Sequence, residues 1–347
     1  MSERSDRVVE RRAAPACLSH SRATITPALR AAVDRLDHRS RHQAAYHFGW
    51  ITADGAPTSA DAGKAVRPAL ALLSAEAVGA PPEVALPGAV AVELVHNFSL
   101  VHDDLMDGDE ERRHRRTVWK LWGPSSAILT GDAMLALAQE VLLDTGLPTV
   151  VPAARLLART TRHLIRGQVQ DLSFEQRSHV TVEECVDMAA GKTGALLSAS
   201  AAIGAVLAGA PGATVDALAL YGDQVGVAFQ LVDDVLGIWG DPAVTGKSVH
   251  SDLRSRKKSL PVSHALNQDG PLSDELAAWL TTPGEPDEEE LRRVAGLIEG
   301  AGGRDWALAE AARRMALAED ALRGVELDAG ARDELLALGR FVVDREV

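Results

Sequence analysis

Two clusters of aspartates stand out because each follows an apolar run and could bind a metal ion. The first is HDDLMD at residues 102–107, and the second is DDVLG at residues 233–237. On a helix, side chains four residues apart share a face, so Asp103 and Asp107 would lie together. Carboxylates without cysteine nearby suit a hard cation such as Mg²⁺, which also binds the phosphates of a substrate. Two such clusters predict a cage for a polyphosphate, and a solvated acidic face is the alternative for either cluster alone.

Lysine is rare in this chain, and its positions favour the same chemistry. Six lysines occur among the 36 Lys and Arg residues. Lys64, Lys192 and Lys247 each lie beside a glycine, where a compact ammonium group can approach phosphate oxygens. Arg112 and Arg113 follow the first acidic cluster closely. These cations are candidates for binding a polyphosphate, although each one alone could be an ordinary surface charge.

The segments that must position these residues have the composition of helices. Long stretches without proline, rich in Ala, Leu, Glu and Arg, occur at 153–210, 212–241 and 287–347. Thr181 with Glu184, and Asp287 with Glu290, have the spacing of helix capping boxes. Alternating β-branched runs are absent, and 4% aromatic content leaves an aliphatic, Ala-rich core. We therefore predict an all-α fold, a bundle of many helices.

The chain is expected to form one domain preceded by an arm. No internal linker or short repeat divides residues 25–347, and residues 1–24 have the composition of a flexible N-terminal arm. The stretch from Thr193 to Val215 carries no charge. Its Ala, Gly and Ser content and Pro211 favour a helix buried in the core over a membrane span.

Charge and cysteine content narrow the partners and the compartment. The net charge is −13, whereas a general binder of nucleic acid or anionic membranes should be basic. Cys17 and Cys185 are too few for a disulfide framework or a thiolate zinc site. We expect a cytoplasmic protein without nucleic-acid partners or a membrane span.

Eight segments together resemble the trans-isoprenyl diphosphate synthase (polyprenyl synthetase) family, over roughly residues 25–347. In the family's order they are GKAVRP (63–68), ELVHNFSLVHDDLMD (93–107), ERRHRRTVW (111–119), GDAML (131–135), GQVQDL (167–172), GKTGAL (191–196), FQLVDDVLGIWGD (229–241) and TGKSVHSDLRSRKKSLP (245–261). The resemblance implies an isoprenoid-synthase-type helical bundle around a deep central cavity, usually in a homodimer. It also implies a chain-elongating prenyltransferase similar to bacterial geranylgeranyl diphosphate synthases.

The resemblance implies how one substrate, an allylic diphosphate, is bound. Asp103, Asp107 and Asp233 would hold three Mg²⁺ ions against its diphosphate. Three further aspartates would support or complete the metal shell: Asp104, Asp171 and Asp234. Four cations would neutralise the same diphosphate: Arg112, Lys192, Lys247 and Lys257. These charges would stabilise the departing pyrophosphate and leave an allylic carbocation in a dry cavity.

The second substrate, isopentenyl diphosphate, is expected in a pocket without metal. Four side chains would hold its diphosphate: Lys64, Arg67, His96 and Arg113. Its double bond would attack the carbocation in a 1'-4 condensation, with Thr193 and Gln230 near the cation and the proton path. A helix back-bonding hydroxyl, a satisfied core amide and a core histidine remain the alternatives for Thr193, Gln230 and His96.

The length of the product is expected to depend on Phe98. It precedes Asp103 by five residues, about 7.5 Å along a helix, and could form a floor under the growing chain. An aromatic residue there, with the small Ser99 beside it and no insertion in DDLMD, resembles one class of geranylgeranyl synthases. We expect geranylgeranyl diphosphate (C20), with farnesyl diphosphate (C15) as the runner-up and ordinary core packing as the alternative for Phe98.

Two segments depart from the family's pattern, and three other functions compete with it. His114-Arg115-Arg116-Thr117 replaces the common Gly-x-Pro-Thr, and the last four residues hold one arginine rather than a basic cluster. A class I terpene cyclase would carry an Asn/Asp-Ser/Thr-Glu second motif. A metal phosphohydrolase would need further histidine ligands, and a non-catalytic partner subunit should have lost an acidic motif. The two acidic motifs therefore favour an elongating synthase.

Overall fold

Helices make up nearly all of the regular structure in the computed structural model of the protein, which describes residues 15–58, 63–240 and 249–344. In chain order the elements are α1 (Ala16–Val33), α2 (His38–His47), α3 (Val66–Ala77), the 3₁₀ turn η1 (Pro82–Ala85), α4 (Leu86–Met106), β1 (Glu111–Arg112), β2 (Arg115–Arg116), α5 (Val118–Trp122), α6 (Pro124–Leu143), α7 (Val150–Glu175), α8 (Val182–Ala189), the π-helical segment η2 (Ala190–Gly194), α9 (Ala195–Leu207), α10 (Gly212–Trp239), α12 (Ser251–Arg254), α13 (Leu260–Leu266), α14 (Pro271–Thr281), α15 (Glu288–Gly300), α16 (Gly303–Arg323) and α17 (Ala329–Val343). The all-α prediction is confirmed.

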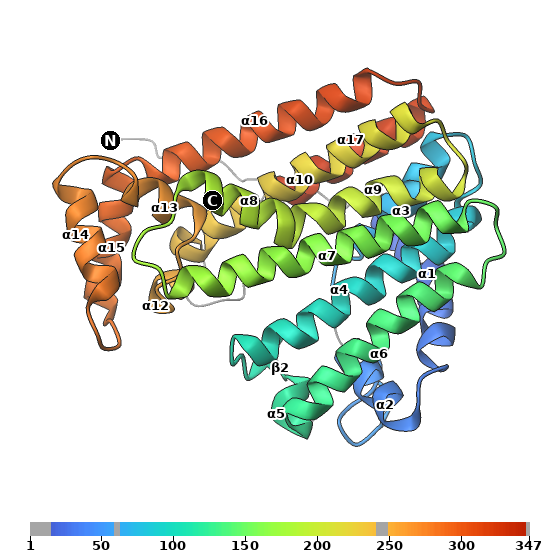
Figure 1. Ribbon diagram of the computed structural model, residues 1–347, viewed down its shortest axis with the longest axis horizontal. Helices are drawn as coiled ribbons and strands as arrows, with labels where there is room; N and C mark the ends of the chain where they lie inside the picture. Colours follow the sequence, from blue (N-terminus) through green and yellow to red (C-terminus); the bar gives the residue numbers. More distant parts are fainter. Residues whose placement is uncertain (1–14, 59–62, 241–248, 345–347) are drawn as a thin grey trace, which may run out of the picture.

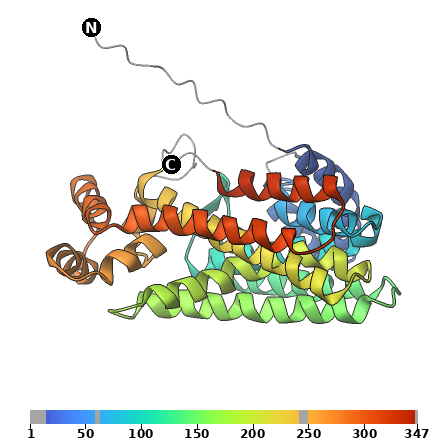
Figure 2. The same cartoon turned by 90° about the horizontal axis from the view of Figure 1, so that it is seen from above.

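Long helices lie side by side and form the body of the molecule (Figures 1 and 2). α10 packs against α9 and α16, α4 packs against α6 and α3, and α9 also contacts α7. The sequence of α9, ALLSASAAIGAVL, consists mostly of small side chains, and most of them are buried. Small residues let neighbouring helices approach closely, so a core poor in aromatic residues still packs densely. This matches the aliphatic, Ala-rich core expected from the composition.

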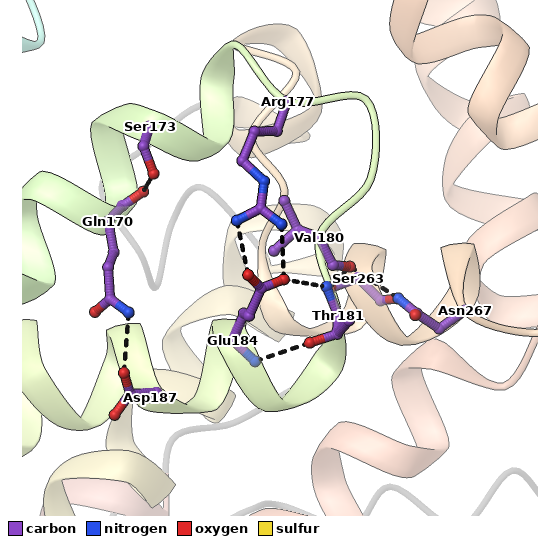
Figure 3. Close-up of polar contacts among 9 residues, drawn as sticks. All are labelled: Gln170, Ser173, Arg177, Val180, Thr181, Glu184, Asp187, Ser263 and Asn267. Carbon is purple, nitrogen blue, oxygen red and sulfur yellow. Dashed lines mark hydrogen bonds and ion pairs between the residues drawn. The ribbon is translucent and has the colours of Figure 1, made fainter.

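The turn between α7 and α8 is tied down by polar contacts that fix the start of the helix leading to η2 (Figure 3). Thr181 Oγ1 accepts from the backbone N–H of Glu184, and Glu184 Oε2 accepts from the N–H of Thr181, which confirms this capping box. The Arg177 guanidinium donates to both Glu184 oxygens, at 2.8 and 2.9 Å. From α13, Ser263 and Asn267 donate to the Val180 carbonyl. α8 therefore starts from a fixed point.

Two features differ from the sequence-based expectations or refine them. α1 starts at Ala16 and buries Cys17, Leu18 and Ser21, so residues 16–24 are helical rather than part of a flexible arm. The apolar side chains of this segment pack in the core. The composition alone did not predict this, because arginines surround the segment in the sequence. The uncharged stretch 193–215 is mostly buried up to Leu207, as expected, but Ala208 to Pro211 divide it between α9 and α10, and residues 208–215 are partly or fully exposed.

Among the residues that the structure describes, three helical stretches are long and apolar enough to cross a membrane by length and composition. They are Pro82–Met106, Pro124–Leu143 and Val182–Leu207, and their most apolar windows are 72%, 39% and 72% buried in the fold. Core packing therefore accounts for the first and third. The second stretch, α6, leaves much of its apolar surface exposed.

α14 and α15 form a helical hairpin at one end of the molecule, next to α12 (Figure 1). Asp287 caps α15 by accepting from the N–H groups of Glu289 and Glu290, as predicted. The Glu290 side chain accepts from Trp279 Nε1 at 2.6 Å, so it joins α15 to α14 instead of completing a capping box. Arg256, after α12, donates to the carbonyls of Trp279 and Gly284 and lies over the Trp279 ring. The hairpin is thereby attached to the α12 segment.

Candidate active site

A cavity of about 740 Å³ opens between the end of α4, α7, η2 and the segment around α12. Its wall carries both carboxylates and lysines: Asp107, Asp109, Glu111, Asp171, Glu175, Asp252, Lys192, Lys257 and Lys258, together with Phe174, Ser251, Ser255 and Arg256. Segments far apart in the sequence thus converge on one polar chamber. The sequence predicted this convergence for Asp107, Asp171, Lys192 and Lys257.

The carboxylates at the end of α4 have the chemistry of a hard-cation site. Burial raises the pKa of Asp103 to about 6, and the charge of Asp107 adds to that rise. Burial also raises the pKa of Asp107. Within the described residues, no three His, Cys, Asp or Glu side chains already surround one point as metal ligands do. Asp103 and Asp107 share a helix face and offer the one or two carboxylates that Mg²⁺ takes when water and substrate phosphates complete its shell.

Lys192 is held in the cavity wall by an ion pair with Asp171. Its Nζ donates to Asp171 Oδ2 at 2.5 Å, and it belongs to the π-helical segment η2. A Cβ on Gly167 of α7 would lie 2.3 Å from the backbone N of Lys192, so only glycine allows the two backbones to meet here. Asp171 lies one turn further along α7 and is therefore brought beside Lys192.

Thr193, Gln230 and Asp234 form one hydrogen-bonded chain. The Thr193 hydroxyl donates to Gln230 Oε1 at 2.8 Å, and Gln230 Nε2 donates to Asp234 Oδ1 at 2.8 Å. Asp234 Oδ2 accepts from the backbone N–H of Leu260 at 2.9 Å. Thr193 therefore does not bond back to its own helix, and Gln230 has a fixed amide orientation. The chain links η2, α10 and α13 beneath the second acidic motif.

Asp104 and Asp234, predicted to complete the metal shell, have other partners in this structure. Asp104 is 1% exposed and accepts a hydrogen bond from Arg112 Nε at 2.6 Å. Successive residues on a helix point about 100° apart. The Asp104 side chain therefore points toward the β1–β2 hairpin and not, like Asp103, along the face that carries Asp107. Burial raises the pKa of Asp104 to about 6, against the pull of Arg112. Asp234 is 3% exposed, and burial raises its pKa as well. Both carboxylates are placed to anchor their neighbours.

A second, cationic cluster of side chains surrounds His96, two turns before Asp103 on α4, where the sequence predicted the metal-free diphosphate. Burial and the charge of Arg113 lower the pKa of Arg67 to about 10, although Glu93 opposes this. Burial and the nearby arginines hold the pKa of His96 well below its usual value. Lys64 Nζ lies 5.2 Å from the centre of the Phe341 ring. Clustered positive charge of this kind favours an anionic ligand.

His47 also belongs to this cationic cluster, although nothing in the sequence marks it as a site residue. Burial, together with the charges of Arg112 and Arg113, lowers its pKa to about 3. Its Nε2 is buried and has no hydrogen-bond partner among the described residues. A single histidine in a short helix carries no recognisable signal, so only the three-dimensional arrangement places it here.

The departure from the family pattern at residues 114–117 forms a tight hairpin. β1 and β2 pair Glu111 with Arg116 and Arg112 with Arg115. Arg113 and His114 form the turn and both have positive φ, at 52° and 59°. This region of backbone conformation suits glycine, so His114 adopts it at an energetic cost. The turn still presents Arg112 to Asp104.

Lys257 lies among carboxylates on the opposite wall of the cavity. Burial alone would lower its pKa, but Asp234, Asp171 and Asp252 outweigh burial and raise it. Asp252 was not among the predicted site residues, although it lies inside the motif at residues 245–261. Its signal was weak because a lone acid in an Arg- and Lys-rich segment looks like a surface charge.

The remaining predicted residues are Asp233, Lys247 and Phe98. Asp233 lies on α10, and its negative charge is one of those that raise the pKa of Lys257. Lys247 lies outside the described residues, as does Asp241. Phe98 is 4% exposed and meets the His102 ring edge-on, with 5.6 Å between ring centres. Its ring is therefore buried and in contact with the residue that opens the first acidic motif.

Comparison with known proteins identifies the family. The model of the polyprenyl synthetase family matches residues 51–298. A (2E,6E)-farnesyl diphosphate synthase of Mycobacterium tuberculosis is 52% identical over 345 residues, covering 99% of this chain and 96% of the relative. A geranylgeranyl diphosphate synthase of the same organism is 42% identical over 334 residues, covering 95% and 94%. The crystal structure of a polyprenyl synthetase from Streptomyces coelicolor A3(2) superposes with a TM-score of 0.92, at 56% identity, and covers 94% of this chain and 99% of that one. The chain therefore belongs to the polyprenyl synthetase family and is a chain-elongating prenyltransferase.

Proposed function

We propose that the protein condenses isopentenyl diphosphate with an allylic diphosphate. The observation that carries this proposal is the pair of charged sites that lie about two turns apart along α4, around His96 and around Asp103. One site combines carboxylates with Lys192 and Lys257. In the other, arginines surround His96, and the buried Glu93 offsets part of their charge. Two chemically different diphosphate sites suit an enzyme that ionises one diphosphate and keeps the other intact. The family membership supports the same conclusion.

The residues on the carboxylate side would bind and release the allylic diphosphate. Asp103, Asp107 and Asp233 would hold Mg²⁺, three ions by the family resemblance, and the ions would neutralise the charge that develops on the departing pyrophosphate. Lys192 and Lys257 would add positive charge on the same oxygens. As the allylic C–O bond breaks, its electron pair leaves with the pyrophosphate. The Asp103 and Asp107 carboxylates, already costly to keep charged, would become stable once a cation pairs with them.

The cationic cluster would hold isopentenyl diphosphate so that its double bond faces the allylic carbon. Lys64, Arg67, His96 and Arg113 would bind its diphosphate without metal. The new C–C bond joins C1 of the allylic group to C4 of isopentenyl diphosphate, and the proton lost from C2 passes to the released pyrophosphate. Thr193 and Gln230, fixed by their hydrogen bonds, would provide a polar edge next to the cation.

We propose a short-chain product, with farnesyl diphosphate (C15) first and geranylgeranyl diphosphate (C20) second. The 52% identity to a farnesyl synthase exceeds the 42% identity to a geranylgeranyl synthase, which reverses the order expected from the sequence motifs. The buried Phe98 ring, about 7.5 Å from Asp103 along α4, would limit the length of the chain pocket and supports a short product of either length. The absence of an insertion in DDLMD supports C20.

We also propose that the protein acts in the cytoplasm as a homodimer. Two adjoining helices expose six large aliphatic side chains: Ile128, Leu129 and Leu143 on α6, and Val151, Ile165 and Val169 on α7. Exposed apolar surface of this extent is typical of an interface, and a twofold pair of identical chains would bury it.

One assay tests the reaction, its metal requirement and the product length together. The protein is incubated with labelled isopentenyl diphosphate, Mg²⁺ and a C5, C10 or C15 allylic diphosphate, and the products are separated by chain length. We expect elongation that disappears with EDTA and returns with Mg²⁺. Activity that continued undiminished in EDTA would contradict the metal-assisted ionisation. A Phe98→Ala variant should make longer products. An unchanged product from an active variant would show that Phe98 does not set the length of the product.

A further inference from the structure

The second acidic motif lacks a carboxylate at the position where the first motif has its third. Asp107 follows Asp103 by four residues at the end of α4, but the residue four positions after Asp233 on α10 is Gly237. Residues four apart share a helix face. Gly237 therefore leaves the place beside Asp233 without a side chain of its own.

The carboxylate of Asp252 lies at this place. A Cβ on Gly237 would be 2.4 Å from Asp252 Oδ2, 2.6 Å from its Cγ and 2.8 Å from its Oδ1. Any larger residue at position 237 would collide with the carboxylate, so the glycine and the aspartate are mutually dependent. Ser251 helps to hold α12 here, because its hydroxyl donates to the Gly237 carbonyl at 3.5 Å.

Asp252 also lies in the electrostatic setting of the site. It lines the same 740 Å³ cavity as Asp107, Asp171 and Lys192. Its charge raises the pKa of Lys257 and also contributes to the raised pKa of Asp234. The carboxylate is therefore within reach of the second acidic motif and on the wall that would face a bound diphosphate.

We propose that Asp252 replaces the missing third carboxylate of the second acidic motif and contributes an oxygen ligand, directly or through water, to the cation held by Asp233. This inference rests on the proposed function. The donor set fits, since the addition is another carboxylate oxygen of the kind that Mg²⁺ prefers. Two simpler roles compete with it: Asp252 as a counter-ion of Lys257 alone, or as a filler against Gly237.

An isosteric substitution separates these roles. Asp252→Asn keeps the packing against Gly237 but removes the charge, and binding of paramagnetic Mn²⁺ in the presence of pyrophosphate is followed by electron paramagnetic resonance. We expect Mn²⁺ affinity to fall about 10- to 100-fold at one site, as for other residues that support a metal. Glu288→Gln is the matched control, because Glu288 pairs with Arg254 and His250 of the α12 segment from outside the cavity. It should stay within about twofold of the native protein. Asp252→Asn with native Mn²⁺ affinity would overturn the proposal.

Moving the carboxylate tests the replacement itself. Gly237→Asp alone should lose Mn²⁺ affinity, because its side chain collides with Asp252. Combined with Asp252→Ala, the new Asp should recover much of the affinity and part of the elongation activity. A folded double variant with no recovery would overturn the replacement, and this variant also decides the question if Asp252→Asn fails to fold. A native protein that neither binds Mn²⁺ with pyrophosphate nor elongates would instead overturn the proposed function.

Discussion

Replacing Asp104 with Asn distinguishes the role seen in the structure from the role expected of a metal ligand. The substitution keeps the shape of a side chain that is 1% exposed and leaves one acceptor for Arg112 Nε. It exchanges a charge-assisted hydrogen bond, about 1.5–3 kcal/mol, for a neutral one of about 0.5–1.5 kcal/mol. Arg112 is 30% exposed and partly screened, so the free energy that holds it in place should fall by about 1 kcal/mol. Because Arg112 is expected to bind the allylic diphosphate, we expect the KM for that substrate to rise roughly fivefold.

The assay measures KM for each substrate and the Mg²⁺ concentration that gives half-maximal activity. Asp104→Asn should change the allylic KM and leave the Mg²⁺ dependence near that of the native protein. Asp103→Asn, which removes a ligand of the proposed metal cage, should instead weaken the response to Mg²⁺ strongly. If Asp104→Asn shifted the Mg²⁺ dependence as far as Asp103→Asn and left the allylic KM unchanged, the anchoring role would be refuted.

The same variant has a signature in the pH dependence of stability. Burial raises the pKa of Asp104 from 3.8 to about 6, so between these values the folded state holds a proton that the unfolded state releases. This group therefore stabilises the fold most below its unfolded pKa, and that contribution is lost as the pH rises through about 6. The Asn variant should lack this part of the slope in thermal unfolding measured from pH 4 to 7.

Three further substitutions test other parts of the site. Lys64→Ala should raise the KM for isopentenyl diphosphate roughly ten- to a hundredfold and the allylic KM less, measured by steady-state kinetics; a larger allylic effect would mean that the two pockets are reversed. His114→Gly should raise the melting temperature by about a degree or two, because it removes part of the roughly 1–2 kcal/mol cost of a left-handed conformation; a lower melting temperature would show that the His114 side chain makes a stabilising contact. Arg256→Met should lower kcat while the helical circular dichroism is kept, because the segment that carries Lys257 loses its attachment to α14; a native kcat would show that this attachment does not position Lys257.

Residue spacing within single helices was predictable because helical geometry fixes it. Asp103 and Asp107 were placed on one face, and the Thr181 capping box was found, from periods of three and four residues. The start of α1 was not predictable in this way. Its buried Cys17 and Leu18 lie among polar residues, and only packing against other helices reveals them as core.

Contacts between distant segments were beyond the sequence. Asp104 differs from Asp103 only by a rotation about α4, and that rotation decides whether a carboxylate faces the cavity or the β1–β2 hairpin. Asp252 meets Gly237 because α12 folds back on α10, and no local pattern encodes that contact. The wide turn η2 and the left-handed turn at His114 are likewise set by tertiary contacts that override local preference.

α4 sets the distance between the two substrate sites. His96 and Asp103, on the same helix, belong to different diphosphate sites and are seven residues apart, which is two turns or about 10 Å of rise. A point substitution on α4 changes the shape of one site, but an insertion or deletion between these residues would rotate one site about 100° away from the other. This stretch should therefore tolerate changes of side chain over evolutionary time and almost no change of length. The enzyme's products can then diversify through the bulk of side chains, while the reacting ends of the two substrates stay the same distance apart.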